Sequence, residues 1–195
     1  MMRSASQTQL VSSSALCRGP ISRRAPPPEI YTKRLRLRPF KDSDHASYAT
    51  FLADEESTRY LGGTRDAETA WRVMASFCGH WNLRGYGPFA IETRESARFV
   101  GYCGPWFPFG KPEQEILWGV MPAARRNGFA AEAARAARQW AYDIGGWTGA
   151  VSYIVPGNAA SEGVARKLGA SPEDQIDMGG IEVNVWRHPG PEALQ

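Results

Sequence analysis

Residues 113–155 allow few folds, because they contain a strand pattern, a helix pattern and a second strand pattern in close succession. "EQEILWGVM" (113–121) is typical of a strand, and the alanine-rich stretch from Gly128 to Asp143 is typical of a helix that Gly145–Gly146 ends. "GAVSYIV" (149–155) is short and almost wholly apolar, which predicts a strand in the middle of a sheet. A strand–helix–strand crossover of this kind predicts two parallel strands.

The N-terminal half of the chain adds one strand and two helices to this prediction. "RLRLRPF" (34–40) alternates leucines with arginines, which predicts a half-buried strand with Leu35 and Leu37 on one face and the arginines, Arg38 included, on the other. Helices are predicted over residues 41–56 and 66–83. The second of these has an apolar stripe made of Trp71, Met74, Phe77 or Cys78, and Trp81.

Two hairpins and a last helix complete the predicted fold. "GPFAIETRE" (87–95) and "FVGYCGPWF" (99–107) flank a tight turn at Ser96–Ala97, and "DQIDMGGIEVNVWRH" (174–188) divides at Gly179–Gly180. Residues 158–169 form a helix that Asn158 caps. The order β-α-α-β-β-β-α-β-α-β-β indicates an α/β fold with a mixed sheet. The helix at 128–143 is expected to pack through Phe129, Ala133, Ala136, Trp140 and Ile144.

The composition indicates one domain with short extensions. The chain has 195 residues, 43% of them hydrophobic, which suits a single core over residues 29–189. Residues 1–28 contain four arginines and no acidic residue and end in "APPP", so they are interpreted as a flexible basic leader. Residues 190–195 form a short tail.

Charge and cysteine usage exclude several classes of protein. A net charge of +3 does not by itself indicate nucleic acid or an anionic membrane as partner. Three widely spaced cysteines without a C-x-x-C argue against a disulfide framework or a zinc site and favour a reducing, cytoplasmic compartment. No metal-like spacing joins the three histidines, and His188 is interpreted as structural. No apolar run reaches the roughly 18 residues of a membrane span.

"ARRNGFAAEA" (124–133) predicts an anion site at the start of the helix at 128–143. A helix N-terminus presents free N–H groups and the positive end of the helix dipole. Arg125 and Arg126 add charge, and Gly128 lets the backbone approach a ligand. The sequence has no P-loop, no G-x-G-x-x-G after a strand, no H-E-x-x-H and no G-x-S-x-G, which leaves this stretch as the candidate phosphate site.

The segment Arg125 to Ala130 fits the pattern [QR]-x-x-G-x-[GA] and resembles the coenzyme A pyrophosphate loop of the GNAT N-acetyltransferase superfamily. The surrounding residues resemble the branch of the ribosomal-protein alanine N-acetyltransferases, over roughly residues 30–188. The matching positions are Glu115, Pro122, Gly128, Glu132, Ala133, Asn158 and Ser161. The chain departs from the wider superfamily at Ala170, where a bulky residue is usual, and at Ala165, where many members have a tyrosine acid.

The resemblance implies acetyl-CoA as co-substrate and direct transfer of its acetyl group to an amine. A protonated amine needs a base, which would be Glu115 acting through water. The N–H of Val120 would donate to the thioester oxygen, and Ser161 would supply an acid near sulfur. Asn158 would bind the pantetheine arm, and the pyrophosphate loop would comprise Arg125, Arg126, Asn127, Gly128, Phe129 and Ala130. Each assignment has a structural alternative: Glu115 as a solvated strand carboxylate, Ser161 as a first-turn serine, and the loop as a basic turn.

The acceptor and the competing functions remain open from sequence alone. The acceptor of an acetyltransferase would be a protein N-terminal amine or a small-molecule amine. An aromatic set could line its pocket or belong to the core: Trp81, Tyr86, Trp106, Phe107 and Phe109. One alternative is a nucleic-acid-binding module, since the helix after the loop carries Arg135 and Arg138. Another is a coenzyme A-binding protein that has lost catalysis. The expected partners are an amine acceptor, no nucleic acid and no membrane, with a monomer or homodimer as assembly.

Overall fold

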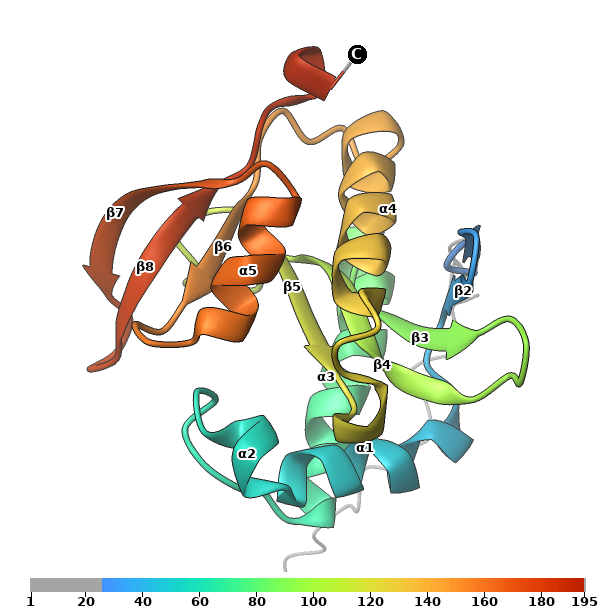
Figure 1. The fold of residues 1–195 in the computed structure, drawn as a ribbon. Helices are drawn as coiled ribbons and strands as arrows, with labels where there is room; N and C mark the ends of the chain where they lie inside the picture. The colour runs from blue at the N-terminus through green and yellow to red at the C-terminus, as the bar shows by residue number, and fades with distance from the viewer. Residues whose placement is uncertain (1–25, 195) are drawn as a thin grey trace, which may run out of the picture.

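A computed structural model describes residues 26–194 as one eight-stranded mixed sheet between two layers of helices (Figure 1). The strand order is β1-β2-β3-β4-β5-β6-β8-β7, and only the β5–β6 pair is parallel. The strands are β1 (Ile30–Tyr31), β2 (Leu35–Arg38), β3 (Phe89–Thr93), β4 (Phe99–Trp106), β5 (Glu115–Val120), β6 (Val151–Ile154), β7 (Ser171–Asp177) and β8 (Glu182–Arg187).

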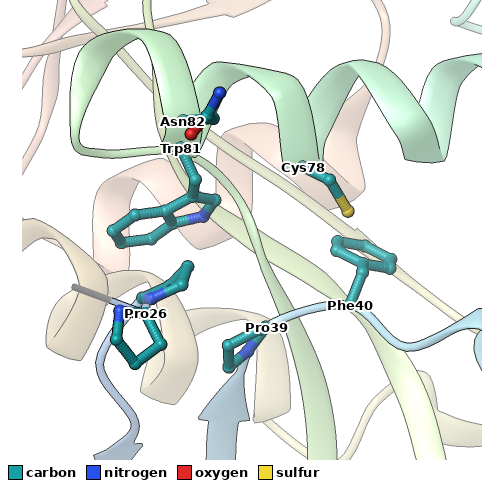
Figure 2. Close-up of a pocket in the computed structure, with 7 residues that line it drawn as sticks. Pro26, Pro39, Phe40, Cys78, Trp81 and Asn82 are labelled. Carbon is teal, nitrogen blue, oxygen red and sulfur yellow. The ribbon is translucent and has the colours of Figure 1, made fainter. Parts of the chain in front are cut away.

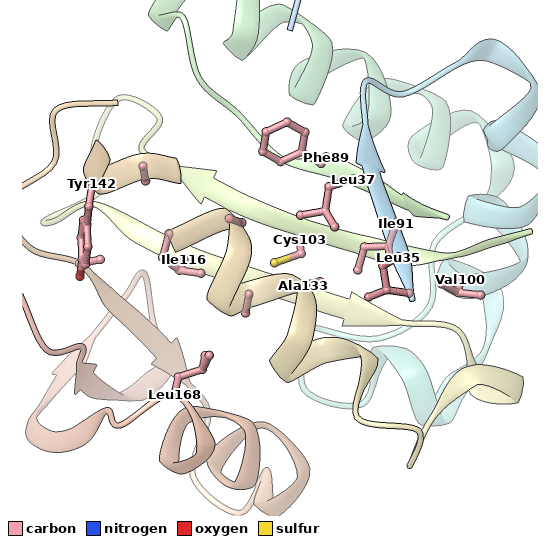
Figure 3. Close-up of a cluster of buried hydrophobic side chains, with 14 of the residues drawn as sticks. Leu35, Leu37, Phe89, Ile91, Val100, Cys103, Ile116, Ala133, Tyr142 and Leu168 are labelled. Atoms are coloured by element: carbon pink, nitrogen blue, oxygen red, sulfur yellow. The ribbon is translucent and has the colours of Figure 1, made fainter. Parts of the chain in front are cut away.

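The helices divide between the two faces of the sheet. α4 (Phe129–Asp143) and α5 (Ala159–Lys167) cover one face, and α1 (His45–Ala53), α2 (Glu55–Thr58) and α3 (Ala67–Arg84) lie on the other. The core under α4 is shown in Figure 3 and includes Leu35, Leu37, Phe89, Ile91, Cys103, Ile116 and Ala133. The core under α1 and α3 is rich in aromatic rings: Tyr48, Phe51, Phe77 and Tyr102. We call the first the α4 face and the second the α3 face.

The predicted fold class and element order are confirmed, with β1 and the short α2 as additions. β6 lies inside the sheet, as its apolar sequence indicates. The β7–β8 turn holds Gly179 and Gly180 at φ 70° and 87°, the left-handed pair that a two-residue hairpin turn requires. The backbone N–H of Met178 donates to the carbonyl of Ile181 at 2.8 Å and closes this turn.

Two predicted packing faces are wrong in part. In α3, Trp71 is 50% exposed and Cys78 is also exposed, whereas Met74, Phe77 and Trp81 are buried. In α4, Ile144 is 72% exposed because it follows the last helical residue. The buried face of α4 is formed instead by small side chains, which let the helix lie close to the sheet: Ala133, Ala134, Ala137 and Ala141.

Arg38 is buried rather than solvent-facing, because the α1 layer covers its face of β2. Its guanidinium donates to both carboxylate oxygens of Asp44 at 2.7 and 2.8 Å and to Glu92 at 2.7 Å. All three side chains are less than 10% exposed. Paired, hydrogen-bonded charges of this kind are tolerated in a protein interior, whereas an unpaired one is not.

Residues 1–25 of the predicted leader lie outside the described residues, so its flexibility stays a prediction. Pro26 and Pro27 line a pocket of about 260 Å³ together with Phe40, Cys78 and Trp81 (Figure 2). The domain surface therefore begins slightly before residue 29. At the other end, Pro191–Leu194 forms a single 3-10 turn. Within residues 26–194, no helix combines the length and apolar character needed to cross a membrane.

Candidate active site

β5 and β6 separate soon after they meet, which opens a wedge in the sheet. β5 pairs with β4 at six positions, from Glu115 to Val120, but its parallel pairing with β6 is confined to Glu115 and Val151. Beyond that pair, one edge of β5 has no neighbouring strand among the described residues. The wedge lies between the two strands that the sequence predicts to be parallel.

Backbone groups of β5 point into the wedge. The N–H of Met121 donates to Val100 of β4 at 2.9 Å, so the odd-numbered residues of β5 face β4. Because hydrogen-bonding direction alternates along a strand, the N–H groups of Trp118 and Val120 face the open edge. The predicted oxyanion donor, Val120, is therefore on the wedge side, and Trp118 is a second candidate that sequence reasoning missed.

A buried series of hydrogen bonds joins β5 and β6 at the closed end of the wedge. Arg138 of α4 donates to Nδ1 of His188 at 3.1 Å, the Nε2–H of His188 donates to Oγ of Ser152 at 2.9 Å, and Ser152 donates to the carbonyl of Ile116 at 2.6 Å. Burial, with two nearby arginines, lowers the pKa of His188 to about 3, so the ring is neutral. The Ser152 hydroxyl thus joins β6 to β5 one residue beyond their backbone pair.

We expect Ser152→Ala to lower stability and to loosen the wedge. The substitution leaves the Ile116 carbonyl and the His188 N–H buried without partners, which costs about 2 kcal/mol. The thermal midpoint is expected to fall by about 4–8 °C. Scanning calorimetry checks this, with Ser171→Ala at an exposed position as control. Equal thermal midpoints for the two variants would show that the hydrogen bonds of Ser152 do not stabilise the fold.

The loop before α4 has the backbone conformation of an anion site. Arg126 and Gly128 lie in the left-handed region at φ 62° and 77°, and Gly128 is the N-cap of α4. A left-handed residue next to a right-handed one makes successive N–H groups converge, and Gly128 stands in this relation to the first residue of α4. The amides from Arg126 to Ala131 donate to no other residue within the described part of the chain. The predicted amide cradle therefore has free donors at the positive end of a helix dipole.

Arg34 and Glu132 join this loop to the residues just before β2, a contact that the sequence analysis does not predict. Arg34 donates to the carbonyl of Asn127 at 2.9 Å and to Glu132 at 2.7 Å, and its guanidinium lies 4.8 Å from the centre of the Phe129 ring. Glu132 also accepts from Thr32 at 2.6 Å. Burial opposes ionisation of Glu132, but these hydrogen bonds outweigh it and lower its carboxyl pKa. Glu132 therefore anchors the start of α4 to the residues just before β2.

The side chain of Arg125 turns away from the loop amides toward α2. Its guanidinium donates to Ser57 at 2.6 Å and pairs with Glu56 at 2.9 Å. On the opposite side, the Tyr60 hydroxyl donates to the carbonyl of Gly157 at 2.8 Å, just before α5. The α2 segment therefore bridges the loop before α4 and the loop before α5.

Glu115 lies at the closed end of the wedge, on the α3 face. Its side chain is 9% exposed and pairs with Lys111, whose ammonium nitrogen lies 4.6 Å from the centre of the Tyr153 ring. Burial raises the pKa of Glu115, and Lys111 opposes this effect. The carboxylate is buried and not solvated, so its structural alternative is an ion pair with Lys111. A buried carboxyl with a raised pKa is suited to accept a proton.

Asn158 and Ser161 occupy the first turn of α5. The Asn158 side chain accepts from the backbone N–H of Ser161 at 3.1 Å and caps the helix. No hydrogen bond joins the Ser161 hydroxyl to Glu115 or to the loop before α4 among the described residues. Their predicted roles toward pantetheine and sulfur therefore stay predictions.

The predicted aromatic set is divided between the core and the surface. Trp81 is buried and donates to Pro88 at 3.0 Å, whereas Phe109 is 99% exposed. Trp106 packs against His80 at 4.6 Å between ring centres, and His80 packs against Tyr86 at 5.1 Å. The set does not form one pocket.

Residues 34–171 match the family model of the acetyltransferase (GNAT) domain. The chain belongs to the GNAT acetyltransferase family. It is 32% identical to the uncharacterised protein YkkB of Bacillus subtilis over 151 residues, covering 72% of this chain and 84% of that protein. It is 26% identical to the uncharacterised N-acetyltransferase YoaA of the same organism over 149 residues, covering 75% and 84%. The family resemblance inferred from the sequence is confirmed.

Solved GNAT structures share the fold. An acetyltransferase from Agrobacterium tumefaciens superposes with a TM-score of 0.76 and 29% identity, covering 83% of this chain and 94% of that one. A ribosomal-protein-S5-alanine acetyltransferase from Vibrio fischeri has a TM-score of 0.65 at 12% identity, covering 84% and 97%. GNAT membership makes the chain an acetyl-CoA-dependent N-acetyltransferase.

Proposed function

We propose that this GNAT protein transfers acetyl from acetyl-CoA to a primary amine by direct attack of the amine, with no covalent enzyme intermediate. The observation that carries the proposal is the wedge beside the loop of free amides. The β5–β6 pair ends at Glu115 and Val151, and the amides from Arg126 to Ala131 have no acceptor within the described residues. An extended thioester carrier with a diphosphate fits these two features together: backbone donors at the helix N-terminus for phosphate, and an unpaired strand edge for the arm.

Acetyl-CoA would supply an activated acetyl group, and the residues of the chain would bind, orient and deprotonate. The amides of Arg126, Asn127, Gly128, Phe129 and Ala130 would hold the diphosphate, with the charge of Arg126 added. Arg125 would contribute through its position in the loop, since its guanidinium already contacts Ser57 and Glu56. Asn158 would reach the arm from the start of α5, and Ser161 would donate near sulfur.

Glu115 would accept the amine proton through water. Along a strand, about 3.3 Å per residue separates Glu115 from Val120 by roughly 16 Å and from Trp118 by roughly 10 Å. A base and an oxyanion donor act on the same reacting centre, so the shorter separation is easier to bridge with ordered water. We therefore add the N–H of Trp118 to that of Val120 as a donor to the thioester oxygen.

Two acceptor classes remain in the proposal. Structural relatives below 25% identity include ribosomal-protein acetyltransferases and the aminoglycoside acetyltransferase AAC(6')-Ib, so the shared fold does not choose between a protein N-terminus and a small amine. Either acceptor would approach from the α3 face, where Glu115 lies.

Thiol release tests the proposal. The full chain is incubated with acetyl-CoA and a panel of peptides with free N-termini, polyamines, amino acids and aminoglycosides, and free thiol is followed over time. Acetylated product from one class identifies the acceptor. Binding of acetyl-CoA in calorimetry without thiol release from any amine would support a coenzyme-binding protein that lacks catalysis. Strong salt-dependent binding to RNA or DNA, without binding of coenzyme, would support a nucleic-acid-binding module.

A further inference from the structure

Tyr102 lies in β4 opposite Gly119 of β5, and its ring crosses the neighbouring strand. A Cβ atom placed on Gly119 would lie 2.7 Å from Cζ of Tyr102 and 2.9 Å from its hydroxyl oxygen. The tip of the ring therefore rests on the β5 backbone, and only a glycine leaves room for it. Gly119 lies between Trp118 and Val120, whose N–H groups face the wedge.

Tyr102 is buried, with 7% of the residue exposed, and its polar group is the hydroxyl at the tip of the ring. It makes no hydrogen bond to any residue in 26–194, whereas the buried Trp81 and Tyr142 donate to carbonyls at 3.0 Å. The hydroxyl oxygen is not among the fully enclosed, unpartnered polar atoms of residues 26–194, so it keeps accessible surface through which a ligand can reach it.

Neighbouring rings hold Tyr102 in place. The rings of Tyr48 and Phe51 meet it edge-on at 5.5 and 5.7 Å between centres, and the Phe77 ring stacks on it at 5.7 Å. Such packing restricts the ring to one orientation. Burial, with the charge of Glu115 nearby, raises the pKa of Tyr102 well above its usual range. The group therefore remains a neutral phenol that donates a hydrogen bond.

We infer that Tyr102 is a further catalytic residue, whose hydroxyl donates a hydrogen bond to the thioester oxygen at the unpaired edge of β5. The inference rests on the proposed function. During transfer, the amine nitrogen bonds to the acetyl carbon and the C–S bond breaks, with its electron pair leaving on sulfur. One amine proton passes through water to Glu115, and Tyr102 keeps its own proton. Tyr102 thus complements the backbone donors on β5, in a chain that has Ala165 where many family members have a tyrosine.

Tyr102→Phe removes only the hydroxyl and keeps the packing of the ring. Loss of one preorganised donor to a developing oxyanion is expected to lower kcat by about 100-fold. The KM for acetyl-CoA is expected to stay within about twofold, and the thermal midpoint is expected to hold, because no protein partner is lost. Tyr48→Phe is the matched control, since Tyr48 belongs to the same ring cluster and lies on α1. It should leave kcat unchanged.

The outcomes separate the inference from the proposed function. Thiol release from the wild type, with Tyr102→Phe and Tyr48→Phe both within twofold of it, would overturn the role of Tyr102 and leave the proposed function intact. A fall in the thermal midpoint of Tyr102→Phe that matches its loss of activity would also overturn it, in favour of a structural role. No thiol release from the wild type with any amine would overturn the proposed function, and the inference with it.

Discussion

Glu115→Gln is expected to lower kcat by about 100-fold or more while acetyl-CoA binding is retained. General bases contribute about 10²–10⁴-fold to proton transfer. Glutamine keeps the shape of the side chain but accepts no proton. Burial raises the pKa of Glu115, so the carboxyl becomes protonated as pH falls through that raised pKa, and wild-type activity should rise with pH in this range. The variant should lose this acidic limb, which a pH profile of kcat checks.

The stability of Glu115→Gln distinguishes loss of chemistry from unfolding. A carboxyl whose folded pKa is raised stabilises the fold below its unfolded pKa, and this contribution is lost as pH rises through the folded pKa. Replacing it with a neutral amide should therefore hold or raise the thermal midpoint at neutral pH. Glu113→Gln is the control, because Glu113 precedes the same strand, is exposed and pairs with Arg187 at 2.6 Å. Equal activity of both variants and the wild type would exclude Glu115 as the base.

The parts of the fold that the sequence predicts well are those that local patterns determine. The crossover from β5 through α4 to β6 follows from two apolar runs around an alanine-rich helix, and the β7–β8 turn follows from Gly179–Gly180. Asn158 is the N-cap of α5, as its position before a helical pattern indicates. Each of these features depends on residues within a few positions of one another.

The features that the sequence does not predict depend on distant partners. Arg38 is buried because Asp44 and Glu92, from two other elements, neutralise it. Ser152 and His188 are 36 residues apart, and their side chains form a hydrogen bond only after β6 and β8 pair. Ile144 continues the apolar spacing of α4 but follows its last residue, so periodicity alone predicts wrongly that Ile144 is buried. Hydrophobic periodicity identifies the apolar face of a helix or strand. It does not show where a helix ends or which face of a strand a neighbouring layer covers.

The candidate site shows the same division between local and distant determinants. The conformation of the loop before α4 is local, because Gly128 permits a left-handed residue at the helix start. The direction of the Arg125 side chain is not local, because α2 supplies its partners. Tyr102 has no sequence signature, since its position over Gly119 becomes visible only when β4 pairs with β5.

Gly128→Val is expected to weaken acetyl-CoA binding, with the dissociation constant rising by about 10-fold. Gly128 has φ 77°, and a β-branched side chain disfavours this region by about 1–2 kcal/mol. The loop would rotate out of the left-handed conformation, and its amides would no longer converge. A valine Cβ itself has room, since the nearest atom is 3.5 Å away on Arg34, so the effect is conformational and not steric. Calorimetry with acetyl-CoA measures it.

Gly146→Val is the matched control for this prediction. Gly146 follows the C-terminal end of α4 at φ 69°, with nothing within 4 Å of an added Cβ, so valine meets the same backbone cost there. Both variants should lose similar stability, and only Gly128→Val should bind acetyl-CoA more weakly. Gly128→Asn should recover part of the binding, because asparagine enters the left-handed region more readily than valine does. Equal dissociation constants for Gly128→Val, Gly146→Val and the wild type would mean that the diphosphate is held elsewhere, and the proposed function would lose the observation on which it rests.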